Sequence, residues 1–233
     1  MSGSIVSAGM RARVRGLAEP VARGLGRVGL TPNHLTFIGF GIAVIAAVAA
    51  AQQAWLAAGL LVLFGAVFDL FDGALARSTG RVTKLGAFYD SVFDRWGEGV
   101  VYVGIAWGCV SAGFAEGAVL AAAALTSAVM VSYARAKSES LGFTSGIRMA
   151  NIGFAPREVR IAVLTIGLVF SGIGGGVARF TPIVCPANVG GCPDLGAHYG
   201  GTALFLALGL ITILATITTI QRILHVRAQA REG

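Results

Sequence analysis

Six long apolar runs limit what this chain can fold into. They cover residues 34–51, 56–68, 99–114, 118–134, 161–178 and 203–220. A helix needs roughly 20 mostly apolar residues to cross a bilayer, and all six runs approach that length once their flanking residues are included. Only 12% of the residues are charged, whereas soluble domains usually carry about 25%. We therefore expect an all-α membrane protein with six transmembrane helices.

The first 30 residues carry a different pattern. Apolar residues recur there at a spacing of three or four, with arginines between them: Val14, Leu17, Val21, Leu25 and Val28. This spacing predicts an amphipathic helix that lies on the membrane surface, and an irregular basic leader is the alternative. Because no continuous apolar core is present here, we expect no secretory signal peptide. We thus expect a juxtamembrane segment over residues 1–30 and a transmembrane domain over residues 31–233.

The basic residues indicate an orientation. With six spans, both termini and the loops after spans two and four lie on one side, and nearly all of the 18 Lys and Arg residues lie there. Arg179 alone would lie on the other side. Since loops rich in Lys and Arg stay in the cytoplasm, we expect a cell-membrane protein with both termini cytoplasmic. The net charge of +7 then reflects topology and contact with anionic membrane lipids, and no nucleic-acid-binding pattern is visible.

Two cysteines, Cys185 and Cys192, lie in the predicted loop between spans five and six. This loop is expected on the non-cytoplasmic side, where a disulfide can form, and a disulfide and two free thiols are equal alternatives. A metal site there would need two further ligands, and only Asp194 and His198 are near. We do not expect one.

Four of the 11 acidic residues stand where the second and third apolar runs meet: Asp69, Asp72, Asp90 and Asp94. On helices, the members of each pair share a face because they are three or four residues apart. The two helices are joined by the short turn STGRVTK, so they run antiparallel and both pairs lie near the cytoplasmic end. Four facing carboxylates need positive charge between them, and carboxylate oxygens suit Mg²⁺ or Mn²⁺. We therefore predict a metal site that holds two ions.

Small residues accompany the aspartates. Gly73, Ala76 and Gly86 leave the backbone open to a bulky ligand, and Arg77 offers a planar fork to a phosphate. Together with a metal they indicate phosphate chemistry. One alternative is that the aspartates have only a structural role, in salt bridges to Arg77 and Arg95. The other is an ion-coupled membrane transporter, whose carboxylates would lie nearer mid-membrane. The clustering at one end, beside a basic surface, favours an enzyme with a cytoplasmic active site.

The spacing Asp69-x2-Asp72-Gly73-x2-Ala76-Arg77-x8-Gly86-x3-Asp90-x3-Asp94 is similar, without departure, to the signature of the CDP-alcohol phosphatidyltransferase family. The resemblance covers most of the chain. It implies transfer of a phosphatidyl group from CDP-diacylglycerol to an alcohol hydroxyl, with release of CMP. It implies that the four aspartates are metal ligands, with Asp94 also the general base that takes the hydroxyl proton. Family members are commonly homodimers, so a homodimer is expected.

The same resemblance implies a set of contacts to the cytidine and diphosphate of CDP-diacylglycerol. These residues are Asn33, His34, Leu35, Thr36, Gly73, Arg77, Thr83 and Gly86. Thr83 has a second interpretation, as the N-cap of the third span. The donor's acyl chains cannot leave the bilayer cheaply, so we expect the site to open sideways to lipid.

The choice of acceptor rests on a narrower resemblance. The sequence YDSVFDRW has the Asp-Ser-x-x-Asp-Arg form of members that use inositol phosphate, whereas phosphatidylglycerophosphate synthases more often show Asp-Pro-x-x-Asp-Lys. The segments VARGLGRVGLTPNHLT, SYARAKSES and TIQRILHV resemble parts of actinobacterial phosphatidylinositol phosphate synthases. In those enzymes three basic residues hold the acceptor phosphate, and Lys137, Arg160 and Arg222 occupy the matching places. Arg135 and Arg157 are near enough in sequence to contribute.

These cations end or begin predicted spans at the cytoplasmic interface, where a dianionic phosphate needs them. Each alone is also explained as an ordinary interfacial anchor. One feature departs from the pattern: the inositol-type members carry Arg-Pro-Glu-Arg before span five, and this chain reads APREVR over residues 155–160. The two arginines keep their spacing and the proline has moved. We expect inositol 1-phosphate as acceptor, with glycerol 3-phosphate as the alternative.

Overall fold

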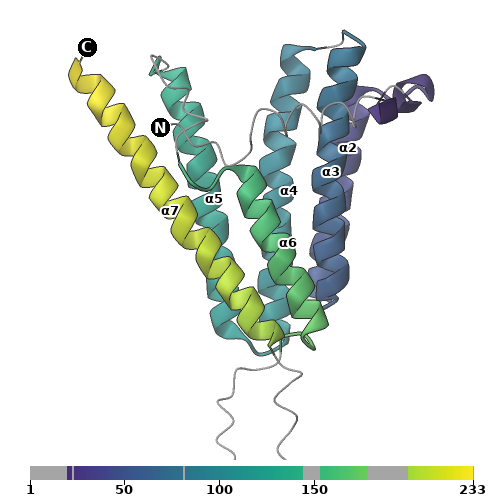
Figure 1. Cartoon of the computed structure of the whole chain (residues 1–233), viewed down its shortest axis with the longest axis vertical. Helices are drawn as coiled ribbons and strands as arrows, with labels where there is room; N and C mark the ends of the chain where they lie inside the picture. The colour runs from purple at the N-terminus through teal and green to yellow at the C-terminus, as the bar shows by residue number, and fades with distance from the viewer. Residues whose placement is uncertain (1–19, 23, 81, 144–152, 178–198, 233) are drawn as a thin grey trace, which may run out of the picture.

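A computed structural model of the chain describes residues 20–22, 24–80, 82–143, 153–177 and 199–232. This part of the chain forms long helices and no strand (Figure 1). The helices are α2 (Pro32–Ala51), α3 (Trp55–Ser78), α4 (Lys84–Ser111), α5 (Ala115–Ser140), α6 (Arg157–Ile173) and α7 (Gly200–Glu232). The predicted all-α class is confirmed.

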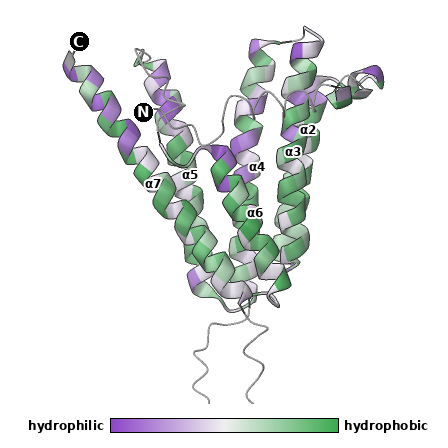
Figure 2. Cartoon of the chain, in the orientation of Figure 1, coloured by the Kyte–Doolittle hydropathy of each residue, from purple (hydrophilic) through white to green (hydrophobic). Residues whose placement is uncertain are grey.

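Four of the described helices are long and apolar enough to cross a membrane: α2, α3, α5 and α7. The first half of α4 carries many charges, and α6 has only 17 residues. Both nevertheless pack between the other helices of the bundle. Figure 2 shows that hydrophilic residues gather toward the upper ends of the helices. The chain is therefore a membrane protein, and the count of six spans stays a prediction.

Two sequence predictions fall on parts of the chain that lie outside the described residues. Of the predicted surface helix, residues 20–22 and 24–27 are helical, while residues 1–19 are outside the description. Within the described part, Ala22 is buried in a small apolar cluster with Leu35 and Leu75. Cys185 and Cys192 also lie outside the described residues. The amphipathic helix and the disulfide stay predictions.

The helices are connected by contacts that run around a ring in the order α2, α3, α6, α7, α5 and α4, and back to α2. As a result α3 and α4, which carry the aspartates, each pack against α2, and α6 packs against α3. Figure 1 shows the helices close together at the lower end and spread apart at the upper end. The beginnings of α4 and α6 both face this wider region.

Glycines bring α2 and α4 into backbone contact. A Cβ atom at Gly104 would lie 2.2 Å from the carbonyl oxygen of Ala47, and one at Gly108 would lie 2.2 Å from that of Ala50. Small residues let helices approach closely in a bilayer, where apolar association alone gives little driving force. This contact holds α4, and with it two of the aspartates, in a defined place beside α2.

Gly104→Ala is expected to destabilise the protein, although alanine is the better helix former by about 1 kcal/mol. The added methyl group meets the α2 backbone, so the helices have to move apart, at a cost of about 1–3 kcal/mol. Gly41→Ala on α2 is the matched control, because a Cβ atom there meets nothing within 4 Å. Thermal unfolding in detergent measures both variants. Equal melting temperatures would contradict the close packing of α2 and α4.

Candidate functional site

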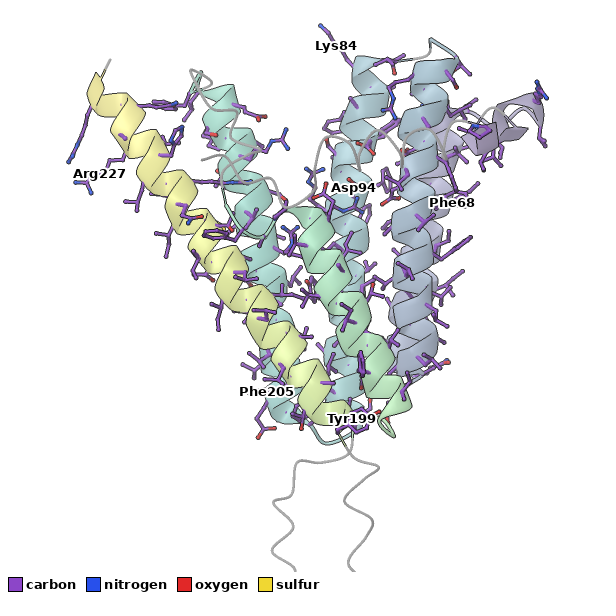
Figure 3. All side chains as sticks on the ribbon, viewed as in Figure 1. Phe68, Lys84, Asp94, Tyr199, Phe205 and Arg227 are labelled. Atoms are coloured by element: carbon purple, nitrogen blue, oxygen red, sulfur yellow. The ribbon has the colours of Figure 1, made fainter. Side chains whose placement is uncertain are left out.

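The four aspartates occupy the predicted helices. Asp69 and Asp72 lie on α3, and Asp90 and Asp94 lie on α4. Asp72 is 7% exposed, the other three are half-buried, and Asp90 is close enough to the others for their charges to interact. Figure 3 shows Asp94 between the helices, below the end of α4 that is marked by Lys84. The structure thus brings the two pairs to the same region, as the sequence predicts.

The carboxylates do not converge on a single point. Asp72 accepts a hydrogen bond from the Thr36 hydroxyl at 3.2 Å and another from the Gly73 amide, while Asp69 and Asp94 turn toward an arginine. Among the described residues, no three His, Cys, Asp or Glu side chains stand close enough together to hold one ion. The assignment of the four aspartates as metal ligands stays a prediction.

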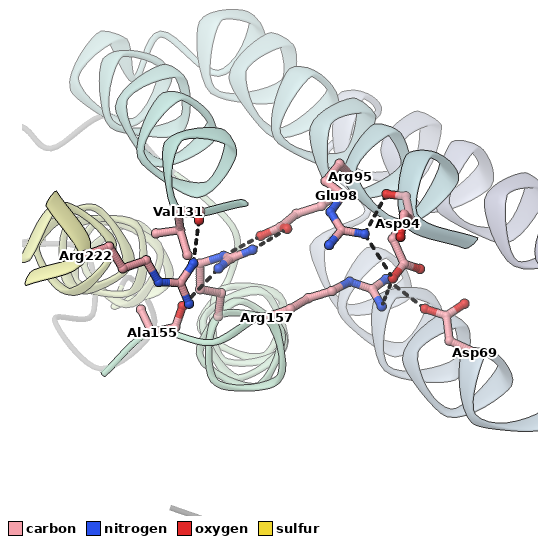
Figure 4. Close-up of polar contacts among 10 residues, drawn as sticks. Asp69, Asp94, Arg95, Glu98, Val131, Ala155, Arg157 and Arg222 are labelled. Carbon is pink, nitrogen blue, oxygen red and sulfur yellow. Dashed lines mark hydrogen bonds and ion pairs between the residues drawn. The ribbon is translucent and has the colours of Figure 1, made fainter. Parts of the chain in front are cut away.

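The arginine that meets the aspartates is Arg157, the first residue of α6. Its Nη2 lies 2.7 Å from Asp69 Oδ2, and its Nη1 lies 3.1 Å from Asp94 Oδ2 (Figure 4). Arg95 is a more distant and more exposed partner of Asp94, at 3.9 Å. The sequence analysis placed Arg157 near the acceptor cations. The position of Arg157 at the start of an apolar run predicted that it lies near the membrane interface. Its pairing with Asp69 and Asp94 was not predictable from the sequence.

Several residues predicted to contact the nucleotide lie around the aspartates. Thr36 reaches Asp72, and a Cβ atom at Gly86 would lie 3.3 Å from Asn33 Oδ1, so the first turn of α2 faces the first turn of α4. Thr83 is the N-cap of α4, since its hydroxyl accepts a hydrogen bond from the Gly86 amide at 3.0 Å. The N-cap interpretation of Thr83 is confirmed, and its contact to a nucleotide stays a prediction.

The remaining nucleotide candidates differ in exposure. The Arg77 guanidinium lies over Gly73, where a Cβ atom would be 3.2 Å from its Nη1. His34 is exposed. Leu35 is 1% exposed and packs in an apolar cluster with Leu75, so it offers almost no free surface to a ligand.

The predicted acceptor cations are not equivalent. Arg160 and Arg222 are 2% and 4% exposed, and they are close enough for their charges to interact. Arg222 donates a hydrogen bond to the carbonyl oxygen of Val131. Lys137 is exposed in the last turn of α5, outside this buried pair, and Arg135 forms an exposed pair with Glu139. The structure brings together two of the three predicted residues.

Arg160 is held by a residue that the sequence analysis did not single out. Its Nε and Nη2 donate to the two carboxylate oxygens of Glu98 at 2.8 and 2.7 Å, and its Nη1 donates to the carbonyl oxygen of Ala155 at 2.9 Å. This bidentate pair joins α4 to α6. Glu98 follows Asp94 by four residues on the same helix face, inside a largely apolar stretch, and that position was a signal for it.

The segment before α6 is tied to α7 by Thr218. The Thr218 hydroxyl accepts hydrogen bonds from the amides of Phe154 and Ala155, both at 3.0 Å. Gly153 has a φ of +111°, and a Cβ atom there would lie 2.1 Å from the Thr218 methyl group. The first turn of α6, which carries both arginines, is therefore placed by α7 as well as by α3 and α4.

A cavity of about 60 Å³ extends inward from the charged cluster. Its lining includes Asp69, Asp94, Glu98 and Arg157, and it continues along α3 as far as Leu61, two helical turns from Asp69. A cavity needs about 10–15 Å³ of such volume to hold one water molecule, so this cavity is larger than a single water requires. The polar site thus borders a small, mostly apolar space between α2, α3, α4 and α6.

Comparison with known proteins places the chain among similar sequences and folds. Residues 29–228 match the model of the CDP-alcohol phosphatidyltransferase family. The chain is 38% identical to archaetidylinositol phosphate synthase of Pyrococcus horikoshii over 72% of this chain and 85% of the relative. It is 34% identical to phosphatidylinositol phosphate synthase of Cutibacterium acnes over 90% of this chain and 91% of the relative.

Solved structures are similar as well. The crystal structure of Mycobacterium tuberculosis phosphatidylinositol phosphate synthase with CDP-DAG bound superposes with a TM-score of 0.71 at 28% identity, covering 90% of this chain and 92% of that one. The same enzyme in complex with manganese and citrate gives a TM-score of 0.71 at 27% identity, covering 90% and 88%.

Proposed function

Because this chain belongs to the CDP-alcohol phosphatidyltransferase family, we propose that it transfers the phosphatidyl group of CDP-diacylglycerol to inositol 1-phosphate and releases CMP. The observation that carries this proposal is the meeting of two aspartate pairs, from α3 and α4, near one end of an apolar helix bundle. The names of the relatives support the acceptor, since they are an archaetidylinositol phosphate synthase at 38% identity and a phosphatidylinositol phosphate synthase at 34% identity.

The donor set fits a hard divalent cation. Asp69, Asp72, Asp90 and Asp94 offer only carboxylate oxygens, which Mg²⁺ and Mn²⁺ prefer, and a similar enzyme was crystallised with manganese. These four residues would hold the metal, which we propose to be two ions of Mg²⁺ or Mn²⁺. Bound metal would offset the charge that develops on the diphosphate during transfer.

Asp94 is proposed as the general base. In the reaction the acceptor hydroxyl oxygen forms a bond to the phosphorus of the phosphatidyl group, and the bond from that phosphorus to the CMP oxygen breaks. The hydroxyl proton passes to the Asp94 carboxylate, which is a suitable acceptor if it lies within hydrogen-bond reach. The Asp94 side chain is 18% exposed, so it is largely shielded from water but not sealed off from it.

The two ends of CDP-diacylglycerol, its nucleotide and its acyl chains, are proposed to lie in different surroundings. We propose that Asn33, Thr36, Gly73, Arg77 and Gly86 surround the cytidine diphosphate, since they lie near the aspartates at the starts of α2 and α4 and toward the end of α3. The acyl chains would lie against exposed apolar side chains of α3, which include Leu60, Leu63, Phe64 and Val67.

The phosphate of the acceptor is proposed to bind to the basic residues of the site. Arg222 and Lys137 are proposed to contact it directly, and Arg160 is proposed to contribute its remaining N–H groups. A pocket of this kind also suits glycerol 3-phosphate, which is the second candidate because it carries the same phosphate. We further propose a homodimer in the cell membrane, with both termini and the active site on the cytoplasmic side.

The test is CMP release by purified protein with CDP-diacylglycerol and Mg²⁺. Inositol 1-phosphate, glycerol 3-phosphate, inositol and serine are offered in turn, with EDTA as the metal-free control. We expect metal-dependent release with inositol 1-phosphate. Release only with glycerol 3-phosphate would keep the chemistry and replace the acceptor. No release with any acceptor, together with ion flux into liposomes, would favour the transporter alternative.

A further inference from the structure

Arg157 occupies the space between the two helices that supply the aspartates. The helices α3 and α4 each pack against α2, and the Arg157 guanidinium bridges a carboxylate of one to a carboxylate of the other. One terminal nitrogen pairs with Asp69 and the other with Asp94, at 2.7 and 3.1 Å. The side chains of all three residues are between 18% and 29% exposed, so these pairs are substantially shielded from water.

This bridge uses the oxygen atoms that a divalent cation would need. A magnesium ion binds carboxylate oxygens at about 2.0–2.1 Å, and a guanidinium nitrogen within hydrogen-bond distance of the same oxygens would face a like charge at very short range. The two cations therefore compete at Asp69 Oδ2 and Asp94 Oδ2. Arg157 is also less firmly held than Arg160, because its buried Nε has no hydrogen-bond partner.

We propose that Arg157 is a built-in counter-ion of the aspartate cluster, which competes with the divalent cation for Asp69 and Asp94 and leaves them when the ion binds. This inference rests on the proposed metal site. Its physical basis is that two carboxylates on neighbouring helices repel one another unless a cation lies between them. Arg157 supplies that cation within the chain and keeps α3, α4 and α6 together, while its long side chain allows it to withdraw.

The test is a titration with Mn²⁺ alone, without nucleotide or acceptor, on full-length protein in detergent from which metal has been removed. The electron paramagnetic resonance signal of free Mn²⁺ reports binding. Arg157→Met is expected to bind Mn²⁺ about tenfold more tightly than the wild type, since a competing unit charge within a few ångströms is removed. In EDTA the same variant is expected to melt at a lower temperature, and Mn²⁺ is expected to raise its melting temperature more than that of the wild type.

Arg95→Met is the matched control. Arg95 also neighbours Asp94, at 3.9 Å, but it is 39% exposed and does not bridge the two helices. If Arg95→Met tightens Mn²⁺ binding as much as Arg157→Met does, general charge and not competition explains the effect, and the inference is overturned. Unchanged Mn²⁺ affinity in Arg157→Met overturns it as well.

A second variant covers the case in which Arg157→Met does not fold. Arg157→Lys keeps the charge but lacks the planar fork that joins two carboxylates, so it is expected to bind Mn²⁺ several-fold more tightly than the wild type. An unchanged affinity would contradict the proposed role of the bridge. The proposed reaction is tested separately by CMP release: a wild type that binds Mn²⁺ but transfers nothing refutes the reaction and not the competition.

Discussion

Asp94→Asn is expected to lower the rate of CMP release by about 10³-fold, because general-base catalysis typically contributes about 10²–10⁴-fold and an amide cannot take up the hydroxyl proton. The substitution keeps the shape of the side chain and its ability to accept a hydrogen bond from Arg157. The protein should therefore remain folded and still bind CDP-diacylglycerol. The measurement is kcat with saturating Mg²⁺ and both substrates, beside CDP-diacylglycerol binding and the melting temperature.

The matched control for this variant is Glu139→Gln, which removes a carboxylate from the same end of the bundle. Glu139 lies on α5, is 42% exposed and pairs with Arg135 at 2.9 Å. Its loss should leave CMP release nearly unchanged. An Asp94→Asn enzyme that turns over normally would rule out Asp94 as the base.

Glu98→Ala is expected to destabilise the protein by about 3–5 kcal/mol, the usual cost of removing one partner of a buried ion pair. The Glu98 and Arg160 side chains are 7% and 2% exposed, so the remaining guanidinium would be buried without its counter-ion. The exposed pair of Arg135 and Glu139 is the comparison, and Glu139→Ala should cost at most about 1 kcal/mol. Unfolding in detergent measures both. Similar losses for the two variants would show that the buried pair is not exceptional.

A double variant separates structure from acceptor binding at Arg160. Replacing both partners with methionine removes the buried charges together, and such apolar replacements are often neutral or stabilising. Glu98→Met with Arg160→Met should therefore recover most of the lost stability. If Arg160 also contacts the acceptor phosphate, the KM for inositol 1-phosphate stays raised in this stable protein while the KM for CDP-diacylglycerol changes little. An unchanged acceptor KM would make Arg160 a purely structural link between α4 and α6.

Much of the site follows from helical periodicity. Asp69 and Asp72 share a face of α3, and Asp90 and Asp94 share a face of α4, because residues three or four apart are neighbours on any helix. The turn between the two helices is short, so their order and antiparallel direction were also predictable. The N-cap role of Thr83 was one of two interpretations for the same reason, since a cap depends only on residues within one turn.

The partners of the arginines were beyond such reasoning. Arg157 and Arg160 stand three residues apart at the start of α6, and the sequence analysis grouped both with the acceptor cations. In the structure Arg157 forms ion pairs with Asp69 and Asp94. Arg160 forms its ion pair with Glu98. Which carboxylate an arginine reaches depends on the helix beside it and on the rotation of that helix, and neither is contained in a local pattern.

The sequence by itself determined the all-α class, the membrane environment and the faces on which the aspartates lie, because apolar length and a period of 3.6 residues are local properties. Only the tertiary structure decided that α6 packs against α3 and so delivers Arg157 to the aspartates. That contact depends on small residues: a Cβ atom at Gly59 would lie 3.0 Å from the Val169 backbone, and one at Gly172 would lie 2.4 Å from that of Leu56. The chain has 34 glycines, and only the folded packing selects which of them face another helix.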